Sequence, residues 1–126
     1  MAVIEREGRY LISRRRPDDS YGGLWEFPGG SRCPDETLEH CLVREIREEL
    51  GLEIAVRQKL RVIRHHTPGR AIRLHCFACR VVSGEPKAID CSDWRWVGSE
   101  ELARYPFPPA SGPLIELLTR GPCGGR

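Results

Sequence analysis

Three glutamates close together between positions 45 and 49 are the residues whose types and spacing could do chemistry. In the stretch 44–49 (REIREE), Glu45, Glu48 and Glu49 stand at i, i+3 and i+4, so a helix would carry all three carboxylates on one face. Like charges at that spacing repel one another, and a cation bound among them would offset the cost to the helix. Because hard divalent ions such as Mg²⁺ prefer carboxylate oxygens, the cluster predicts a divalent-metal site.

A solvated, ion-paired helix face is the competing interpretation of these acids. Arg44 lies four residues before Glu48 and can pair with it. Glu45 lies four residues before Glu49, and no base in that pair offsets the repulsion. The spacing of the acids does not decide between the two interpretations, but the residues around them do.

Segment 30–52 resembles the Nudix box, G-x5-E-x7-R-E-U-x-E-E-x-G-U, in which U is aliphatic. It matches the pattern at every constrained position: Gly30, Glu36, Arg44, Glu45, Ile46, Glu48, Glu49, Gly51 and Leu52. The chain therefore resembles the Nudix hydrolases, which cleave nucleoside diphosphates linked to another group. The resemblance implies an α/β (α+β) fold of the Nudix type, an α/β/α sandwich with a mixed sheet.

The resemblance also implies roles for individual residues. Glu45, Glu48 and Glu49 are expected to bind Mg²⁺, with Mn²⁺ as a substitute, and the Gly29 carbonyl is expected to be a further ligand. Glycine permits the close backbone approach that this requires. The other constrained positions are expected to support the box structurally, with ion pairs at the two charged ones: Gly30, Glu36, Arg44 and Gly51.

A fourth carboxylate outside the box is expected to act as metal ligand or as general base for the attacking water. Asp90 is the candidate, because it lies six residues before Trp96, where relatives often carry an acid. Asp93 is the alternative. An exposed loop aspartate can also be a turn residue with no catalytic role.

The segments outside the box resemble the MutT-like branch, which hydrolyses nucleoside triphosphates to the monophosphate and pyrophosphate. Its best-known members remove 8-oxo-dGTP from the nucleotide pool and so serve DNA repair. Arg15 resembles the arginine that contacts the nucleotide, and Phe27 the aromatic that lies against the base. A solvated loop charge and a core aromatic are the respective alternatives.

Ser111 departs from the bacterial prototype, which has an asparagine after Phe-Pro-Pro-Ala. A hydroxyl offers one donor and is shorter than an amide, so it cannot make the same paired contact with an oxidised guanine. Ser111 is also a suitable helix N-cap. Other substrates therefore remain open: ADP-ribose, a dinucleotide polyphosphate or a cytidine nucleotide. A non-catalytic domain that recognises 8-oxoguanine is disfavoured, because every box carboxylate is present.

Length and charge set the remaining expectations. The chain of 126 residues fits one domain over residues 1–120, with a disordered tail at 121–126. The net charge of +2 is too small to argue for a nucleic-acid polymer as partner. No apolar run has the length of a membrane span, so we expect a cytoplasmic protein, monomeric or homodimeric, whose partner is a nucleotide substrate.

The secondary-structure pattern predicts a helix between strands, with a second helix near the end. The first helix is expected to begin at Asp35 and to stop at Gly51. The other expected elements are strands at 2–5, 9–13, 60–65, 71–82 and 94–97, and helical segments at 99–105 and from Ser111. Cys76 and Cys79 lie on one strand with opposite orientations, which argues against a zinc site and for free thiols.

Overall fold

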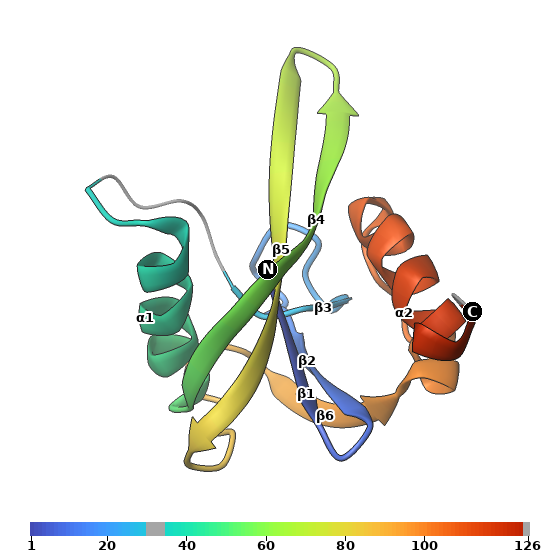
Figure 1. The fold of residues 1–126 in the computed structure, drawn as a ribbon. Helices are drawn as coiled ribbons and strands as arrows, with labels where there is room; N and C mark the ends of the chain where they lie inside the picture. The colour runs from blue at the N-terminus through green and yellow to red at the C-terminus, as the bar shows by residue number, and fades with distance from the viewer. Residues whose placement is uncertain (30–34, 125–126) are drawn as a thin grey trace.

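A mixed six-stranded sheet separates two helices in the computed structural model, which describes residues 1–29 and 35–124 (Figure 1). The elements are β1 (Ala2–Arg6), β2 (Arg9–Arg14), β3 (Trp25–Glu26), α1 (Leu38–Leu50), β4 (Glu53–Thr67), β5 (Arg70–Ser83), β6 (Asp93–Gly98), the 3₁₀ segments η1 (Ser99–Arg104) and η2 (Pro109–Ser111), and α2 (Gly112–Gly124). The strand order is β3-β2-β1-β5-β4, and β6 pairs with β2. Only β1 and β5 pair in parallel in this described part, which makes the sheet mixed.

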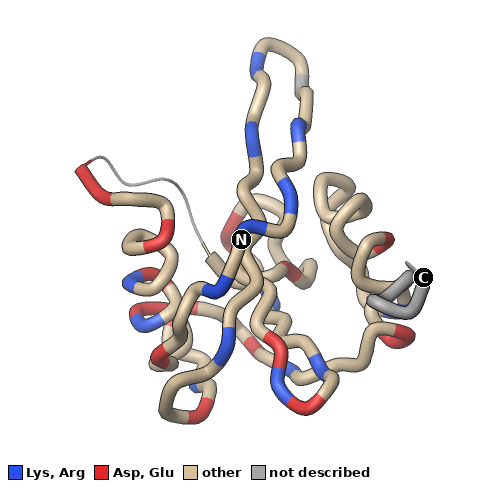
Figure 2. The backbone as a smooth tube through the Cα atoms, in the orientation of Figure 1, with Lys and Arg blue, Asp and Glu red and all other residues tan. Residues whose placement is uncertain are grey.

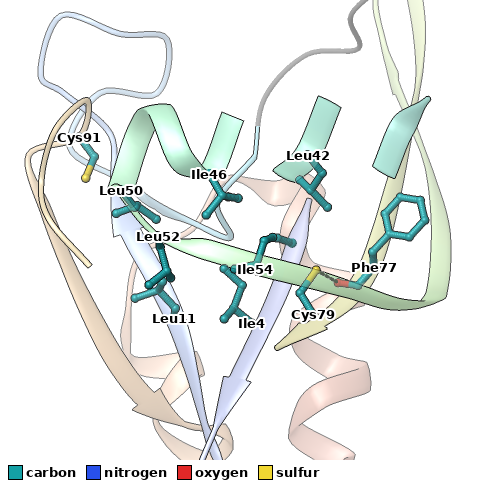
Figure 3. Close-up of a cluster of buried hydrophobic side chains, with 11 residues drawn as sticks. Ile4, Leu11, Leu42, Ile46, Leu50, Leu52, Ile54, Phe77, Cys79 and Cys91 are labelled. Atoms are coloured by element: carbon teal, nitrogen blue, oxygen red, sulfur yellow. Dashed lines mark hydrogen bonds between the residues drawn. The ribbon is translucent and has the colours of Figure 1, made fainter. Parts of the chain in front are cut away.

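Each face of the sheet is covered by one helix, so the architecture is the α/β/α sandwich expected from the sequence. Helix α1 buries Leu42, Ile46 and Leu50 against one face, where they pack with apolar strand residues (Figure 3). Helix α2 buries Leu114 and Leu118 on the other face. At about 2 kcal/mol for each buried leucine or isoleucine, these contacts fix both helices on the sheet.

The N-cap of helix α1 lies two residues later than Asp35, the position that the sequence predicts. Thr37 is the N-cap, and its hydroxyl accepts a hydrogen bond of 3.0 Å from the backbone N–H of His40. Asp35 has a φ of 67°, so its backbone is left-handed rather than extended as an N-cap requires. The end of the helix is as predicted, because Gly51 adopts φ 64° and its N–H donates to the Arg47 carbonyl at 2.9 Å.

Strands β4 and β5 form a long ribbon whose tip projects beyond both helices (Figure 1). Strand β4 begins at Glu53, well before residue 60, where the sequence pattern places its start. Register shifts between Val56 and Gln58 and between Lys59 and Arg61 explain the difference. A bulge inserts an extra residue into one strand and so breaks the alternation of apolar and polar positions.

The C-terminal helix and the two cysteines of strand β5 complete the comparison with the expectation. Helix α2 continues to Gly124, into the segment for which the sequence predicts disorder, and residues 125–126 lie outside the described part. Cys79 packs on the α1 side of the sheet and Cys76 on the α2 side, as the strand pattern predicts. Both thiols are buried, and because they face opposite sides of the sheet they cannot share one ion.

Candidate active site

A cavity of about 580 Å³ opens between helix α1 and the β4–β5 ribbon. Helix α1 contributes Leu38, Leu42 and Glu45 to its lining, and strand β5 contributes residues from Arg70 to Phe77. The third wall comes from the segment before the box, namely Arg15, Glu26, Phe27 and Gly29. The cavity thus brings together the predicted metal helix and the predicted nucleotide contacts.

Four carboxylates lie within electrostatic reach of one another around Glu49, and two of them, Glu26 and Glu45, line this cavity. The pKa of Glu49 is raised from 4.5 to about 7, first by burial and then by the carboxylates of Glu26, Glu45 and Asp90, against a hydrogen bond from the Gly29 backbone that lowers it. A carboxylate whose pKa is raised by neighbouring acids is one that a cation would stabilise in its charged form. The electrostatics therefore fit a cation-binding site.

Glu48 lies beside Glu49 on helix α1 and forms an ion pair with Arg44. The Arg44 guanidinium contacts Glu48 at 3.0 Å and Glu36 at 2.9 Å. Arg44 therefore joins the helix to the segment that precedes it, which is the bracing role that the box pattern predicts for Arg44 and Glu36. The Glu48 side chain is 60% exposed, so it can turn toward an ion near Glu49 without unfolding the helix.

The loop that carries Asp90 is anchored on the end of α1. The backbone N–H groups of Ile89 and Asp90 both donate to the Glu49 carbonyl, at 3.1 and 3.0 Å. Arg16 holds the Asp90 carboxylate at 3.1 Å. The alternative candidate, Asp93, pairs with Arg95 within β6 at 3.5 Å. Of the two acids, Asp90 is therefore the one that is fastened beside Glu49.

Glu26 belongs to this cluster, although the sequence analysis did not single it out. Burial raises its pKa, and the partner Arg15, whose guanidinium lies 2.7 Å from the carboxylate, lowers it. Strand β3 places Glu26 opposite Ser13 of β2. In the sequence, the only signal was a single acid between two aromatic residues in a short apolar stretch.

Gly29 lies close against helix α1. Its φ of 126° is one that only glycine adopts readily, and a Cβ at this position would lie 2.8 Å from the Leu42 side chain. Its backbone also forms the hydrogen bond to Glu49 noted above. The peptide group is therefore near the carboxylates, where a carbonyl ligand is expected. Gly30, the first residue of the box, lies outside the described residues.

The two other predicted substrate contacts are placed less favourably. Phe27 is only 1% exposed, and its ring stacks on Phe107 with centroids 5.3 Å apart, which favours the core role. Ser111 is also buried, ends η2 immediately before α2, and does not line the cavity. Arg15 and Phe27 both line it, and Arg15, whose side chain is 27% exposed, is the better placed of the three to contact a nucleotide.

The donors around Glu49 are chemically suited to Mg²⁺ or Mn²⁺, since they are carboxylates and a backbone carbonyl. Among residues 1–29 and 35–124, however, no three acidic, histidine or cysteine side chains converge into a ready-made metal cage. Magnesium sites commonly use one or two carboxylates together with water and substrate phosphates. The open arrangement is compatible with such a site.

Comparison with known proteins supports the resemblance to the Nudix hydrolases. Residues 1–117 match the family model of the NUDIX domain. A CTP pyrophosphohydrolase of Escherichia coli K12 is 39% identical over 93% of this chain and 87% of its own length. An 8-oxo-dGTP diphosphatase of the same organism is 31% identical over 95% and 94%.

Solved structures show the same relationship. The E. coli ORF135 protein superposes with a TM-score of 0.79 at 37% identity, covering 97% of this chain and 88% of that one. A MutT Nudix hydrolase from Burkholderia pseudomallei gives 0.74 at 29% identity, with 94% of each chain covered. No helix in the described residues is long and apolar enough to cross a membrane. Its sequence, fold and carboxylate site together place this chain in the Nudix family, as a MutT-like Nudix hydrolase.

Proposed function

We propose that the chain is a metal-dependent pyrophosphohydrolase that converts a nucleoside triphosphate to the monophosphate and pyrophosphate. The observation that carries the proposal is the carboxylate cluster around Glu49, whose pKa is raised to about 7 and whose members Glu26 and Glu45 line the cavity. Acidic side chains beside a cavity repel an anionic ligand such as a nucleotide. A divalent metal ion bound between the carboxylates and the phosphates removes this repulsion. Oxidised purine triphosphates such as 8-oxo-dGTP and cytidine triphosphates are the candidate substrates, because the named relatives act on nucleotides of these kinds.

The chain's own residues have separate tasks in this reaction. Glu45, Glu48, Glu49 and the Gly29 carbonyl would hold Mg²⁺, which supplies neutralisation of phosphate charge. Water attacks phosphorus, the new P–O bond replaces the bridging P–O bond of the triphosphate, and pyrophosphate leaves. Asp90 would accept the proton that the water loses, and the hydrogen bond from its backbone to the Glu49 carbonyl supports this role.

Arg15 is the residue positioned to hold the nucleotide. Its guanidinium lines the cavity and contacts Glu26. An arginine can donate to a phosphate or base oxygen while it keeps one carboxylate partner, because it has five N–H donors. The Arg15–Glu26 pair therefore presents both a donor and an acceptor to a bound nucleotide.

The test is pyrophosphate release from CTP and from 8-oxo-dGTP in the presence of Mg²⁺. We expect turnover in the wild type and a loss of 10²-fold or more on Glu49→Gln, since removal of a metal or transition-state contact has about this effect. Glu39→Gln is the matched control, because Glu39 is an exposed glutamate on the same helix. A folded Glu49→Gln protein with undiminished turnover would refute the assignment. Inactivity of the wild type on every nucleoside triphosphate would refute the proposed reaction.

A further inference from the structure

The segment 54–84, here called the cationic arm, concentrates the positive charge of the chain. It contains seven of the 20 Lys and Arg residues and none of the 18 Asp and Glu residues, so it carries +7 while the rest of the chain carries −5. Figure 2 shows the cations along both strands of the ribbon, with acids confined to the body of the protein. The seven cations are Arg57, Lys59, Arg61, Arg64, Arg70, Arg73 and Arg80. The net charge of +2 hides this separation.

Part of the cationic arm continues the wall of the active-site cavity. Arg73 lines the cavity, and Arg64 stands directly opposite it in the β4–β5 pairing. Directly opposed residues share a face of the sheet, so Arg64 lies on the cavity side of the ribbon. Lys59 lies on that side too, because its ammonium is 5.6 Å from the ring centre of Phe77, another cavity residue.

Four of these seven cations have no acidic partner in the described part of the chain. Arg57, Arg64 and Arg73 take part in no ion pair within residues 1–29 and 35–124, and neither does Lys59. The Arg64–Arg73 pair places like charges across two strands, which destabilises a sheet. A ribbon with this charge pattern gains nothing in stability from it, so the charges point to an anionic ligand.

The carboxylates around Glu49, two of which line the cavity, explain why such a ligand would need guidance. A nucleoside triphosphate carries one negative charge on each internal phosphate and about two on the terminal one. Glu26, Glu45, Glu49 and Asp90 repel it on approach, and the cationic arm attracts it. Clefts lined by charge opposite to that of the ligand raise association rates by about 10 to 10³-fold.

We propose that the cationic arm is an electrostatic guide that selects highly charged nucleotides and draws them into the cavity. The proposal rests on the proposed function and narrows its substrate class. Nucleoside triphosphates are favoured over nucleotides without a terminal phosphate, such as ADP-ribose. The cationic arm acts on the association of the nucleotide and not on the chemical step. It therefore affects kcat/KM and leaves kcat at saturation unchanged.

The experiment compares two triple variants that remove the same charge from different places. R57Q/K59Q/R64Q removes three exposed cations of the arm that do not line the cavity. R9Q/K87Q/R104Q removes three exposed cations outside the arm, none of them in an ion pair of the described residues. Circular dichroism and thermal unfolding establish that both proteins are folded.

At low ionic strength we expect the arm variant to lose about tenfold in kcat/KM for the triphosphate, with kcat unchanged, whereas the control variant stays within about twofold of the wild type. The difference should vanish near 1 M salt, where the Debye length is about 3 Å. Dissociation constants for CTP, CDP and CMP, measured by titration calorimetry, should rise in the arm variant most for CTP and least for CMP.

Equal effects of the two triple variants would overturn the guide, as would a loss that persists at high salt or one that is the same for CTP and CMP. Failure of the proposed function would appear differently, as absence of turnover in the wild type. The calorimetric comparison of CTP, CDP and CMP still decides the guide in that case, because it needs no turnover.

Discussion

Replacement of Glu49 by glutamine should stabilise the metal-free protein at neutral and alkaline pH. The pKa of Glu49 is raised from 4.5 to about 7, first by burial and then by Glu26, Glu45 and Asp90. At about 1.4 kcal/mol per pKa unit, this rise corresponds to at most about 3 kcal/mol of unfolding free energy.

The direction follows from proton uptake. Between pH 4.5 and 7 the folded protein binds the Glu49 proton more tightly than the unfolded chain does, so the unfolding free energy falls as the pH rises through this range. The stability contributed by the protonated carboxyl is complete below pH 4.5 and lost above pH 7. Glutamine resembles the protonated carboxyl at every pH, so the Glu49→Gln protein should keep this stability above pH 7.

Urea unfolding in EDTA, followed by circular dichroism, measures the effect. We expect wild type and Glu49→Gln to have similar stability near pH 4.5 and to differ by up to about 3 kcal/mol at pH 8, or by about 10 °C in the midpoint of thermal unfolding. The exposed Glu39→Gln should follow the wild type. If Glu49→Gln were no more stable than the wild type at pH 8, the carboxylate cluster would not be strained and the reasoning would be refuted.

Magnesium should have the opposite pH dependence. An ion bound by carboxylates competes with protons, so Mg²⁺ should raise the unfolding temperature of the wild type more at pH 8 than at pH 5. The same addition should raise that of Glu49→Gln much less. An equal rise in the two proteins at pH 8 would place the bound ion away from Glu49.

Three further substitutions test other parts of the structure. Phe27→Ala removes a buried ring stacked on Phe107 and should lower the unfolding free energy by about 3–5 kcal/mol; a loss below about 1 kcal/mol in urea unfolding would show that the ring is not in the core. Gly51→Ala forces a Cβ into φ 64° and should cost about 1 kcal/mol by the same assay, with no change in KM. Arg15→Gln leaves Glu26 without its partner and should raise KM about tenfold with a smaller change in kcat, whereas an unchanged KM would remove Arg15 from the nucleotide contacts.

The box helix was predictable from the sequence because its apolar stripe, its acids and its stop signal all fall within one continuous segment. Leu42, Ile46 and Leu50 are buried as their spacing indicates, and Gly51 ends the helix. The start was misplaced, because the choice between Asp35 and Thr37 depends on the path of the preceding chain rather than on residue type. Both side chains can cap a helix. Asp35 does not do so because its backbone is left-handed, whereas an N-cap residue has an extended backbone.

The cluster around Glu49 could be predicted only in part, since its members come from distant segments. Glu45 and Glu49 are neighbours on the helix. Glu26 reaches them through the pairing of β3 with β2, and Asp90 through hydrogen bonds of its loop to the Glu49 carbonyl. A two-residue strand leaves almost no periodic signal, and the docking of a loop on a helix end leaves none. The core position of Phe27 likewise depends on contact with Phe107, eighty residues away in sequence.

Within residues 1–29 and 35–124, strand β4 pairs with β5 alone and so forms an edge of the sheet. Such an edge can template the addition of a second chain. Two copies joined along β4 would bring Arg57, Lys59 and Arg64 of each close to those of the other, and the ribbons would repel. The same cations that would draw a nucleotide in therefore also keep the longest strand from pairing with its own copy. Concentrated salt should weaken this protection, so the protein is expected to keep its colloidal stability best in dilute buffer.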